Sequence, residues 1–234
     1  MIRYFEDRVN PITVRTSEGI ANLIRREILT GKFKPDQPLM ERSIAQELGV
    51  SRTPVREALF TLQGEGLVEL VPRRYARVRR ITRQDIAQIY SMRLVLETHA
   101  ARSAALYADR DAILNIEVAL LRQESLDTSC SALEQANADL AFHAAVTAAA
   151  GSQVQLTIIN HVLAMTATLR SRIKYEGKRA KMAVKQHREV LKAIKASDAD
   201  KAGELMKAHI EWSTANAREM GLLTDPDSKP TTSR

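Results

Sequence analysis

Two arginines and four candidate metal ligands are the residues of this 234-residue chain whose types and spacing suggest chemistry. Arg52 and Arg56 are four positions apart, so on a helix both side chains project from the same face. A helix that enters the major groove of DNA needs long donors near its N-terminus, because base edges are read by hydrogen bonds. The pair therefore predicts DNA reading, with one arginine at a guanine edge and the other at a base or phosphate.

The candidate metal ligands lie in the second half of the chain. Asp139 and His143 are again four positions apart, and His187 and His209 follow in two later helical segments that could pack side by side. Three imidazoles and a carboxylate suit a divalent Zn²⁺, Ni²⁺ or Mn²⁺ ion that keeps positions open for a ligand. A single histidine is more often a core or surface residue, so the spacing alone leaves a structural role open.

The segments that must position the arginines resemble a small DNA-binding fold. Apolar residues recur at helical spacing in three stretches, which end near Gly31, Gly49 and Gly66. Ser51 or Thr53 is suited to cap the third helix. Residues 67–71 and 76–79 then alternate as two short strands around a basic tip at residues 73–75. Three helices and a hairpin predict a winged helix-turn-helix over residues 17–80.

The residues predicted to contact DNA lie on the second helix, at the start of the third helix and at the basic tip of the hairpin. They are Arg42, Ser51, Arg52, Thr53, Pro54, Arg56, Arg73, Arg74 and Tyr75. The net charge of +7 favours an anionic partner. Residues 1–80 hold 15 Lys and Arg against 10 Asp and Glu, so most of the excess lies in this part.

The remaining chain reads as helices with short breaks, so the fold class is mainly all-α. We expect an all-α helical bundle over residues 83–219 for effector binding and dimerisation, a flexible arm at 1–16 and a disordered tail at 220–234. The predicted helices of the bundle are 83–108, 111–125, 131–149, 153–173, 178–196 and 198–219.

The compartment is predicted from the cysteine content and from the absence of an export or membrane segment. A single cysteine excludes an internal disulfide and fits a reducing compartment. Residues 140–169 contain no Asp, Glu, Lys or Arg, but Gly151 and several polar residues favour a buried helix pair over a membrane span. We therefore expect a cytoplasmic protein without a membrane partner.

Residues 48–59, Leu-Gly-Val-Ser-Arg-Thr-Pro-Val-Arg-Glu-Ala-Leu, closely resemble the DNA-binding motif of the GntR family of transcription regulators. The resemblance covers residues 17–80. It implies that the helix-turn-helix residues named above lie at the DNA and that the hairpin tip enters the minor groove. Tyr75 stands where the family usually has a glycine, so the contacts at the tip are expected to differ.

Residues 83–219 resemble the helical FCD-type domain of the FadR subfamily within this family. The resemblance implies that Asp139, His143, His187 and His209 bind the metal. Arg93 either clamps a carboxylate effector or forms an ion pair with Glu97. His161 is a second candidate for the effector cavity. Arg170 and Arg172 are interpreted as surface charges, with a place at the ligand as the alternative.

The leading hypothesis is a homodimeric regulator that is not an enzyme. It would repress transcription from an inverted-repeat operator of double-stranded DNA and respond to a small carboxylate effector bound beside the metal. Two alternatives stay open at this point. One is a metal-dependent enzyme that uses the His and Asp residues to activate water, and the other is an effector-free DNA-binding protein.

Overall fold

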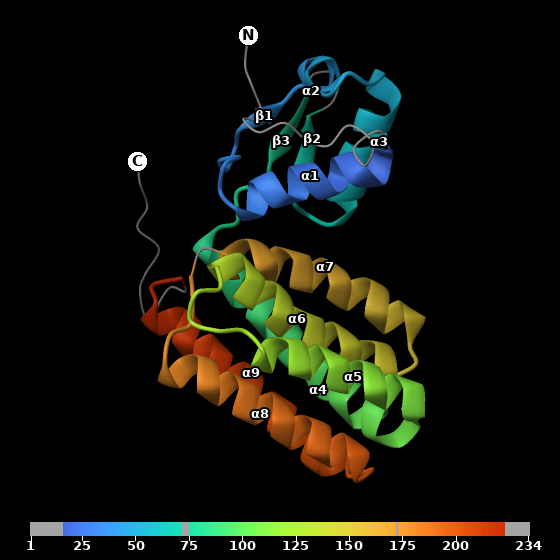
Figure 1. The fold of residues 1–234 in the computed structure, drawn as a ribbon, viewed down its shortest axis with the longest axis vertical. Coiled ribbons are helices and arrows are strands. Elements are labelled where there is room, and N and C mark those ends of the chain that lie inside the picture. The colour runs from blue at the N-terminus through green and yellow to red at the C-terminus, as the bar shows by residue number, and fades with distance from the viewer. Residues whose placement is uncertain (1–15, 72–74, 172, 223–234) are drawn as a thin grey trace.

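The computed structural model describes residues 16–71, 75–171 and 173–222. Its N-terminal part contains three helices and a small sheet, and its C-terminal part is helical throughout (Figure 1). The N-terminal elements are α1 (Ser17–Leu29), β1 (Pro38–Leu39), α2 (Glu41–Leu48), α3 (Arg52–Gly64), β2 (Val68–Val71) and β3 (Tyr75–Val78).

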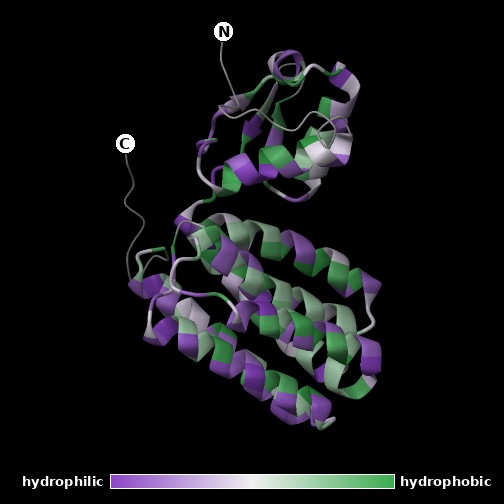
Figure 2. Ribbon diagram, viewed as in Figure 1, coloured by the Kyte–Doolittle hydropathy of each residue, from purple (hydrophilic) through white to green (hydrophobic). Residues whose placement is uncertain are grey.

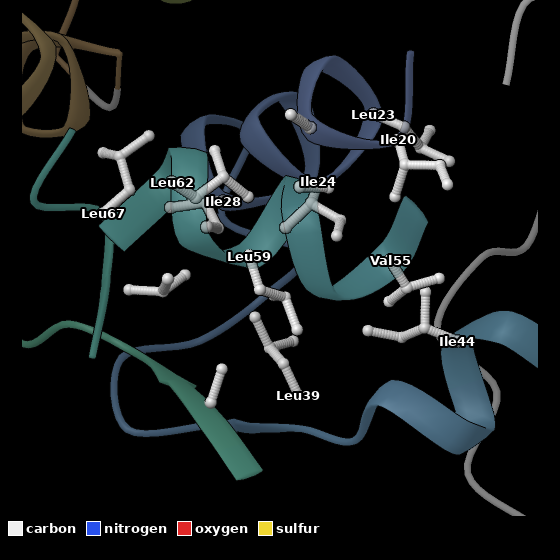
Figure 3. Close-up of a cluster of buried hydrophobic side chains, with 14 of the residues drawn as sticks. Ile20, Leu23, Ile24, Ile28, Leu39, Ile44, Val55, Leu59, Leu62 and Leu67 are labelled. Atoms are coloured by element: carbon white, nitrogen blue, oxygen red, sulfur yellow. The ribbon is translucent and has the colours of Figure 1, made fainter. Parts of the chain in front are cut away.

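The core of the N-terminal part is formed by one face of each helix together with the sheet. Thr16 caps α1, because its side chain accepts a hydrogen bond from the backbone N–H of Gly19. Ile24 of α1 and Leu59 of α3 are almost fully buried and face each other across this core, above Leu39 of β1 (Figure 3). The apolar face of α3 thus anchors the helix, while its other face stays available.

A tight turn sets the direction of α3 relative to α2. Gly49 ends α2 in the left-handed region with φ of 65°, which a residue without Cβ adopts at little cost. The backbone N–H of Val50 closes the turn on the carbonyl of Ala45. Ser51 then precedes α3, which begins at Arg52. The start of α3 therefore lies beside α2.

The sheet has three strands in the order β1-β3-β2, and both pairs are antiparallel. The predicted hairpin corresponds to β2 and β3, whereas β1 was not predicted. Leu39 pairs with Ala76 and is fully buried. A strand of two residues is too short for an alternating pattern, so only the packing of Leu39 reveals it.

The C-terminal part contains six helices within the described residues, as the periodicity predicts. They are α4 (Arg83–Tyr107), α5 (Arg110–Glu124), α6 (Ala132–Ala149), α7 (Gln153–Arg170), α8 (Lys178–Lys195) and α9 (Ala199–Glu219). Hydrophobic residues predominate along α6 (Figure 2), which packs against α4, α5 and α7. No helix in the described ranges is long and apolar enough to cross a membrane.

The two parts meet where the end of α1 approaches α7 (Figure 1). Leu29, the last residue of α1, is buried in a cluster that also contains Ile86 of α4 and Leu163 of α7. On the other side of the bundle, α8 lies far from the N-terminal part. Helices α7 and α4 therefore both contribute to the contact with the N-terminal part.

Candidate nucleic-acid interface and metal centre

The exposed face of α3 carries the two predicted reading arginines. The side chains of Arg52 and Arg56 are 61% and 53% exposed. On the opposite face, Val55 and Leu59 are 0% and 1% exposed and pack into the core. This division allows the helix to be held by its apolar face while the guanidinium groups remain free to reach a ligand in solution.

Glu41, the first residue of α2, binds both arginines. Its Oε1 accepts from Nε of Arg56 at 3.0 Å, and its Oε2 accepts from Nη2 of Arg56 at 2.9 Å and of Arg52 at 3.1 Å. The hydrogen bond from Arg56 is the main cause of a lowered pKa of the Glu41 carboxyl. Sequence reasoning missed Glu41, because the contact joins residues on different helices.

The other predicted DNA contacts lie around the same corner or outside the described residues. Arg42, Ser51 and Thr53 are exposed, and Pro54 is half-buried in the first turn of α3. Ser51 makes no capping hydrogen bond, so its hydroxyl is available to other partners. Tyr75 begins β3 and is half-buried. The hairpin-tip residues Arg73 and Arg74 lie outside the described residues.

Three of the four predicted metal ligands come together inside the helical bundle. His143 on α6, His187 on α8 and His209 on α9 are 1%, 0% and 2% exposed. Each offers one ring nitrogen, and these three atoms lie within 4.8 Å of one another. A group of imidazoles at this separation is suited to hold a metal ion.

Hydrogen bonds to glutamine side chains fix the proton positions on two of these rings. Nδ1 of His187 lies 2.7 Å from Oε1 of Gln123, and Nδ1 of His209 lies 2.9 Å from Oε1 of Gln186. An amide oxygen only accepts, so each Nδ1 carries the proton and each Nε2 keeps a lone pair. Gln123 is oriented in turn, because its Nε2 donates to Oδ1 of Asp139.

His143 completes the set in the same way. Its Nδ1 contacts the carboxylate of Glu97, while its buried Nε2 has no hydrogen-bond partner in the described part of the chain. The Nε2 atoms of His187 and His209 are 3.1 Å apart with no proton available between them. Facing lone pairs repel one another unless a cation lies between them, so the residues present fit a metal ion.

Burial keeps the imidazoles of His187 and His209 neutral, which is the state that binds metal. Removal from water is the main cause that lowers the pKa of His187 to about 3, and the nearby His143 adds to it. The same effect of burial lowers the pKa of His209 well below its usual value. At neutral pH the lone pairs are therefore not blocked by protons.

Asp139, the fourth predicted ligand, lies at the edge of this cluster. It is 1% exposed, and its Oδ2 is 3.8 Å from Nε2 of His143. The same oxygen accepts from Nη1 of Arg170 at 2.6 Å. Burial acts to raise the pKa of Asp139, but Arg170 and the histidines outweigh it and the pKa is lowered. Asp139 is therefore a carboxylate next to the three imidazoles.

The interpretation of Arg170 as a surface charge is wrong, because its side chain is buried. It is 3% exposed, and its guanidinium carbon lies 4.3 Å from the centre of the Tyr175 ring. The sequence offered only a weak sign of this position, namely that Arg170 ends a long stretch without charges. Arg172, interpreted in the same way, lies outside the described residues.

The two predicted effector contacts occupy different environments. Arg93 is fully buried, and its Nε donates to Oε1 of Glu97 at 2.6 Å, so the ion-pair alternative is present. Its Nη1 and Nη2 have no hydrogen-bond partner among the residues that the structure covers. His161 is half-buried, and its Nδ1 lies 2.9 Å from the carbonyl of Thr157 on the same helix. It does not join the histidine cluster.

A cavity of about 860 Å³ opens beside the cluster. Its lining includes Gln123 and Asp139, which touch the histidines, and the cations Arg170 and Lys174. Neither Arg93 nor His161 belongs to the lining. A small molecule in this cavity would reach Asp139 and the positive charge of Arg170 at once.

Comparison with known proteins agrees with both halves of this description. The family model described as bacterial regulatory proteins of the gntR family matches residues 16–78, and the FCD domain model matches residues 88–211. The Uxu operon regulator of Haemophilus influenzae is 30% identical over 233 residues, which cover 92% of this chain and 86% of that protein.

Two further proteins show the same similarity over most of their length. The HTH-type transcriptional repressor RspR of Escherichia coli is 25% identical over 215 residues, 92% of this chain and 94% of its own. A solved GntR-type transcriptional regulator from Rhodococcus sp. RHA1 has a TM-score of 0.70 and 24% identity, with 87% and 97% of the two chains covered. This last likeness shows the fold alone.

Proposed function

The chain belongs to the GntR family of bacterial regulatory proteins and carries an FCD domain, and from this premise we propose how its transcription control works. As a DNA-binding transcription regulator it represses from an inverted-repeat operator and responds to a small carboxylate effector beside a divalent metal ion. The single observation that carries the effector part is the convergence of three histidine ring nitrogens beside Gln123 and Asp139, which line the cavity.

The proposed division of labour follows the two matched segments. Residues 17–80 bind DNA and residues 83–219 bind the effector and dimerise, with an arm at 1–16 and a tail at 220–234. Arg52 and Arg56 read base edges, while Arg42, Ser51, Thr53 and the hairpin tip contact the backbone or the minor groove. The exposure of both reading arginines supports this role.

The proposed metal site consists of His143, His187 and His209 with Asp139 as the carboxylate. Zn²⁺, Ni²⁺ and Mn²⁺ all accept such a set. When bound, the ion supplies open coordination positions for a carboxylate oxygen. The surrounding residues orient the ligands: Gln123 and Gln186 orient the rings of His187 and His209, and Glu97 orients the ring of His143.

Two cations of the cavity, Arg170 and Lys174, support an anionic effector, while the lining as a whole holds four basic and four acidic residues. Arg170 and Lys174 line the cavity, and a small organic acid there would lie close to both. Arg93 remains a proposed effector contact through its unpartnered Nη atoms. The observed cavity lends no support to Arg93 or to His161, since neither lines it. Effector binding alters DNA affinity only if the effector binds two domain arrangements unequally.

Replacing Lys174 with methionine is expected to weaken effector binding by about tenfold, because a charge-assisted hydrogen bond is lost. The unliganded protein should lose little stability, since Lys174 is half-buried and its hydrogen bond from Nζ to the carbonyl oxygen of Thr128, at 2.6 Å, is exposed. Thermal-shift titration with a panel of small carboxylates and sugar acids measures the effector affinity and the unfolding temperature. Lys185→Met on the exposed face of α8 is the matched control. A panel in which no compound shifts the wild-type protein contradicts the proposed effector class.

A dimer is proposed because an inverted repeat presents two half-sites related by a two-fold axis. The exposed faces of α4 and α7 suit the dimer contact. Met92 and Val95 on α4 and Val154 and Ile158 on α7 are 42–72% exposed. The two helices are adjacent, and α7 carries no charged residue before Arg170. A second copy of the chain would cover these apolar side chains.

Replacing Val95 with glutamate is expected to raise the dimer dissociation constant on the order of a hundredfold, because a charge without a partner becomes buried. Light scattering over a concentration series measures the effect. Leu121→Glu on α5, at a side chain of similar exposure, is the control and should leave the dimer intact. If the α5 variant dissociates and the α4 variant does not, the dimer contact lies elsewhere.

The metal-dependent enzyme is the less supported alternative, because the matched relatives are transcription regulators. The effector-free DNA-binding protein predicts no response to carboxylates or metal. A gel-shift titration tests the leading proposal directly. The native upstream region should shift at moderate salt, and addition of the effector should change the shift.

A further inference from the structure

The Glu41 carboxylate occupies a specific edge of the Arg56 guanidinium. Arginine has five N–H donors, which form one pair of parallel bonds along Nε and Nη2 and another along Nη1 and Nη2. Glu41 accepts from Nε at 3.0 Å and from Nη2 at 2.9 Å. The Nη1–Nη2 edge therefore stays free of Glu41, and this edge can donate two hydrogen bonds to O6 and N7 of a guanine.

The same carboxylate also restrains Arg52 through a single hydrogen bond at 3.1 Å. The Glu41 side chain is only 24% exposed, so it moves less freely than the two arginines that it holds. One negative charge is thus shared by two positive charges at the start of α3. The cluster keeps a net charge of +1 towards DNA.

An arginine side chain without such a partner can bind a phosphate of the DNA backbone instead of a base edge. The phosphates carry full charge and are present at every sequence, so free arginines bind them without discrimination. A carboxylate between the two arginines repels phosphates and holds the guanidinium of Arg56 in one plane. Both effects disfavour backbone contacts relative to base contacts.

We infer that Glu41 is a positioning residue that determines the DNA specificity of this protein. It binds the side edge of Arg56 and one donor of Arg52, so that the arginines read guanine edges instead of the nearest phosphates. The inference rests on the proposed role of Arg52 and Arg56 in DNA reading. Glu41 itself touches no base.

The test compares two duplexes and two variants of the full-length protein. A duplex enriched by the protein from a random-sequence library is the specific probe, and a scrambled duplex of equal composition is the non-specific probe. Glu41→Gln removes the charge and keeps an acceptor oxygen. Glu57→Gln removes the same charge from the exposed part of α3 and is the matched control.

Glu41→Gln is expected to reduce the ratio of specific to non-specific affinity by about tenfold, which is the discrimination of one bidentate base contact. Binding to the scrambled duplex should tighten. The slope of log K against log salt concentration should become steeper by about one to two, which corresponds to one or two more released ions. Glu57→Gln should leave the ratio unchanged. A purely structural role of Glu41 would lower both affinities together and leave the ratio intact.

The outcomes separate this inference from the proposal on which it rests. If the library yields no enriched duplex, or if Arg56→Ala keeps the full ratio, DNA reading by α3 is wrong and the inference fails with it. If Arg56→Ala loses the ratio while Glu41→Gln keeps it, only the role of Glu41 is overturned. An equal loss in both glutamine variants also overturns it, because a general change of charge then explains the result.

Discussion

Replacing Arg52 and Arg56 together with alanine should lower the affinity for the enriched duplex by at least about thirtyfold, because two bidentate base contacts at about 1–3 kcal/mol each contribute at least about 2 kcal/mol. The scrambled duplex should lose far less, since other cations of the domain still contact phosphates. Titration of both duplexes by fluorescence anisotropy measures the difference.

The fold should survive this double substitution. Both side chains are more than half exposed, and the residues that anchor α3 lie on its other face. Surface changes of this kind alter the free energy of unfolding by no more than about 0.5 kcal/mol. Arg122→Ala on the exposed part of α5 removes a cation from the other domain and is the control. Equal losses on both duplexes would contradict base reading by these arginines.

Removal of metal should lower the thermal stability of the protein by about 10 °C. An ion that binds only the folded state at a thousand times its dissociation constant stabilises by about 4 kcal/mol. For a chain of this size, each kcal/mol corresponds to roughly 2–4 °C in the melting temperature. Differential scanning fluorimetry with a chelator, followed by addition of Zn²⁺, Ni²⁺ or Mn²⁺, measures the change and ranks the ions.

His187→Gln should abolish this response, because the glutamine keeps a polar group but removes the Nε2 ligand. His161→Gln is the matched control, since His161 lies outside the cluster and should leave the response unchanged. The response of the wild-type protein to chelator keeps the test valid even if His187→Gln folds poorly. An equal metal response in both variants would show that the ion binds elsewhere.

Local patterns in the sequence were sufficient to predict where the helices lie. Each apolar stripe repeats within three or four residues, and capping residues such as Thr16 mark where a helix begins. The predicted bounds of the bundle helices differ from the observed ones by at most three residues, with the largest difference at the end of α7, which stops at Arg170. The placement of Arg52 and Arg56 on one exposed face follows from the same spacing.

The contacts between different elements could not be predicted from the sequence. Three examples involve residues that are distant along the chain or lie on different elements. They are the pairing of Leu39 with Ala76, the contact of Glu41 with Arg56 and the burial of Arg170 beside Asp139. A charged residue at the end of a helix is usually exposed, so the sequence alone favours the wrong environment for Arg170. The ion pair of Arg170 with Asp139 makes its burial tolerable.

Residue types and their spacing indicate which side chains have the right chemistry, and the packing of the helices brings some of these side chains together. Side-chain type and spacing identified three histidines, but their convergence depends on how α6, α8 and α9 pack. The direction of their lone pairs depends on Gln123 and Gln186, which no spacing rule relates to the histidines. The reason is that helical periodicity acts over one turn of backbone, whereas a site is formed by side chains from separate elements.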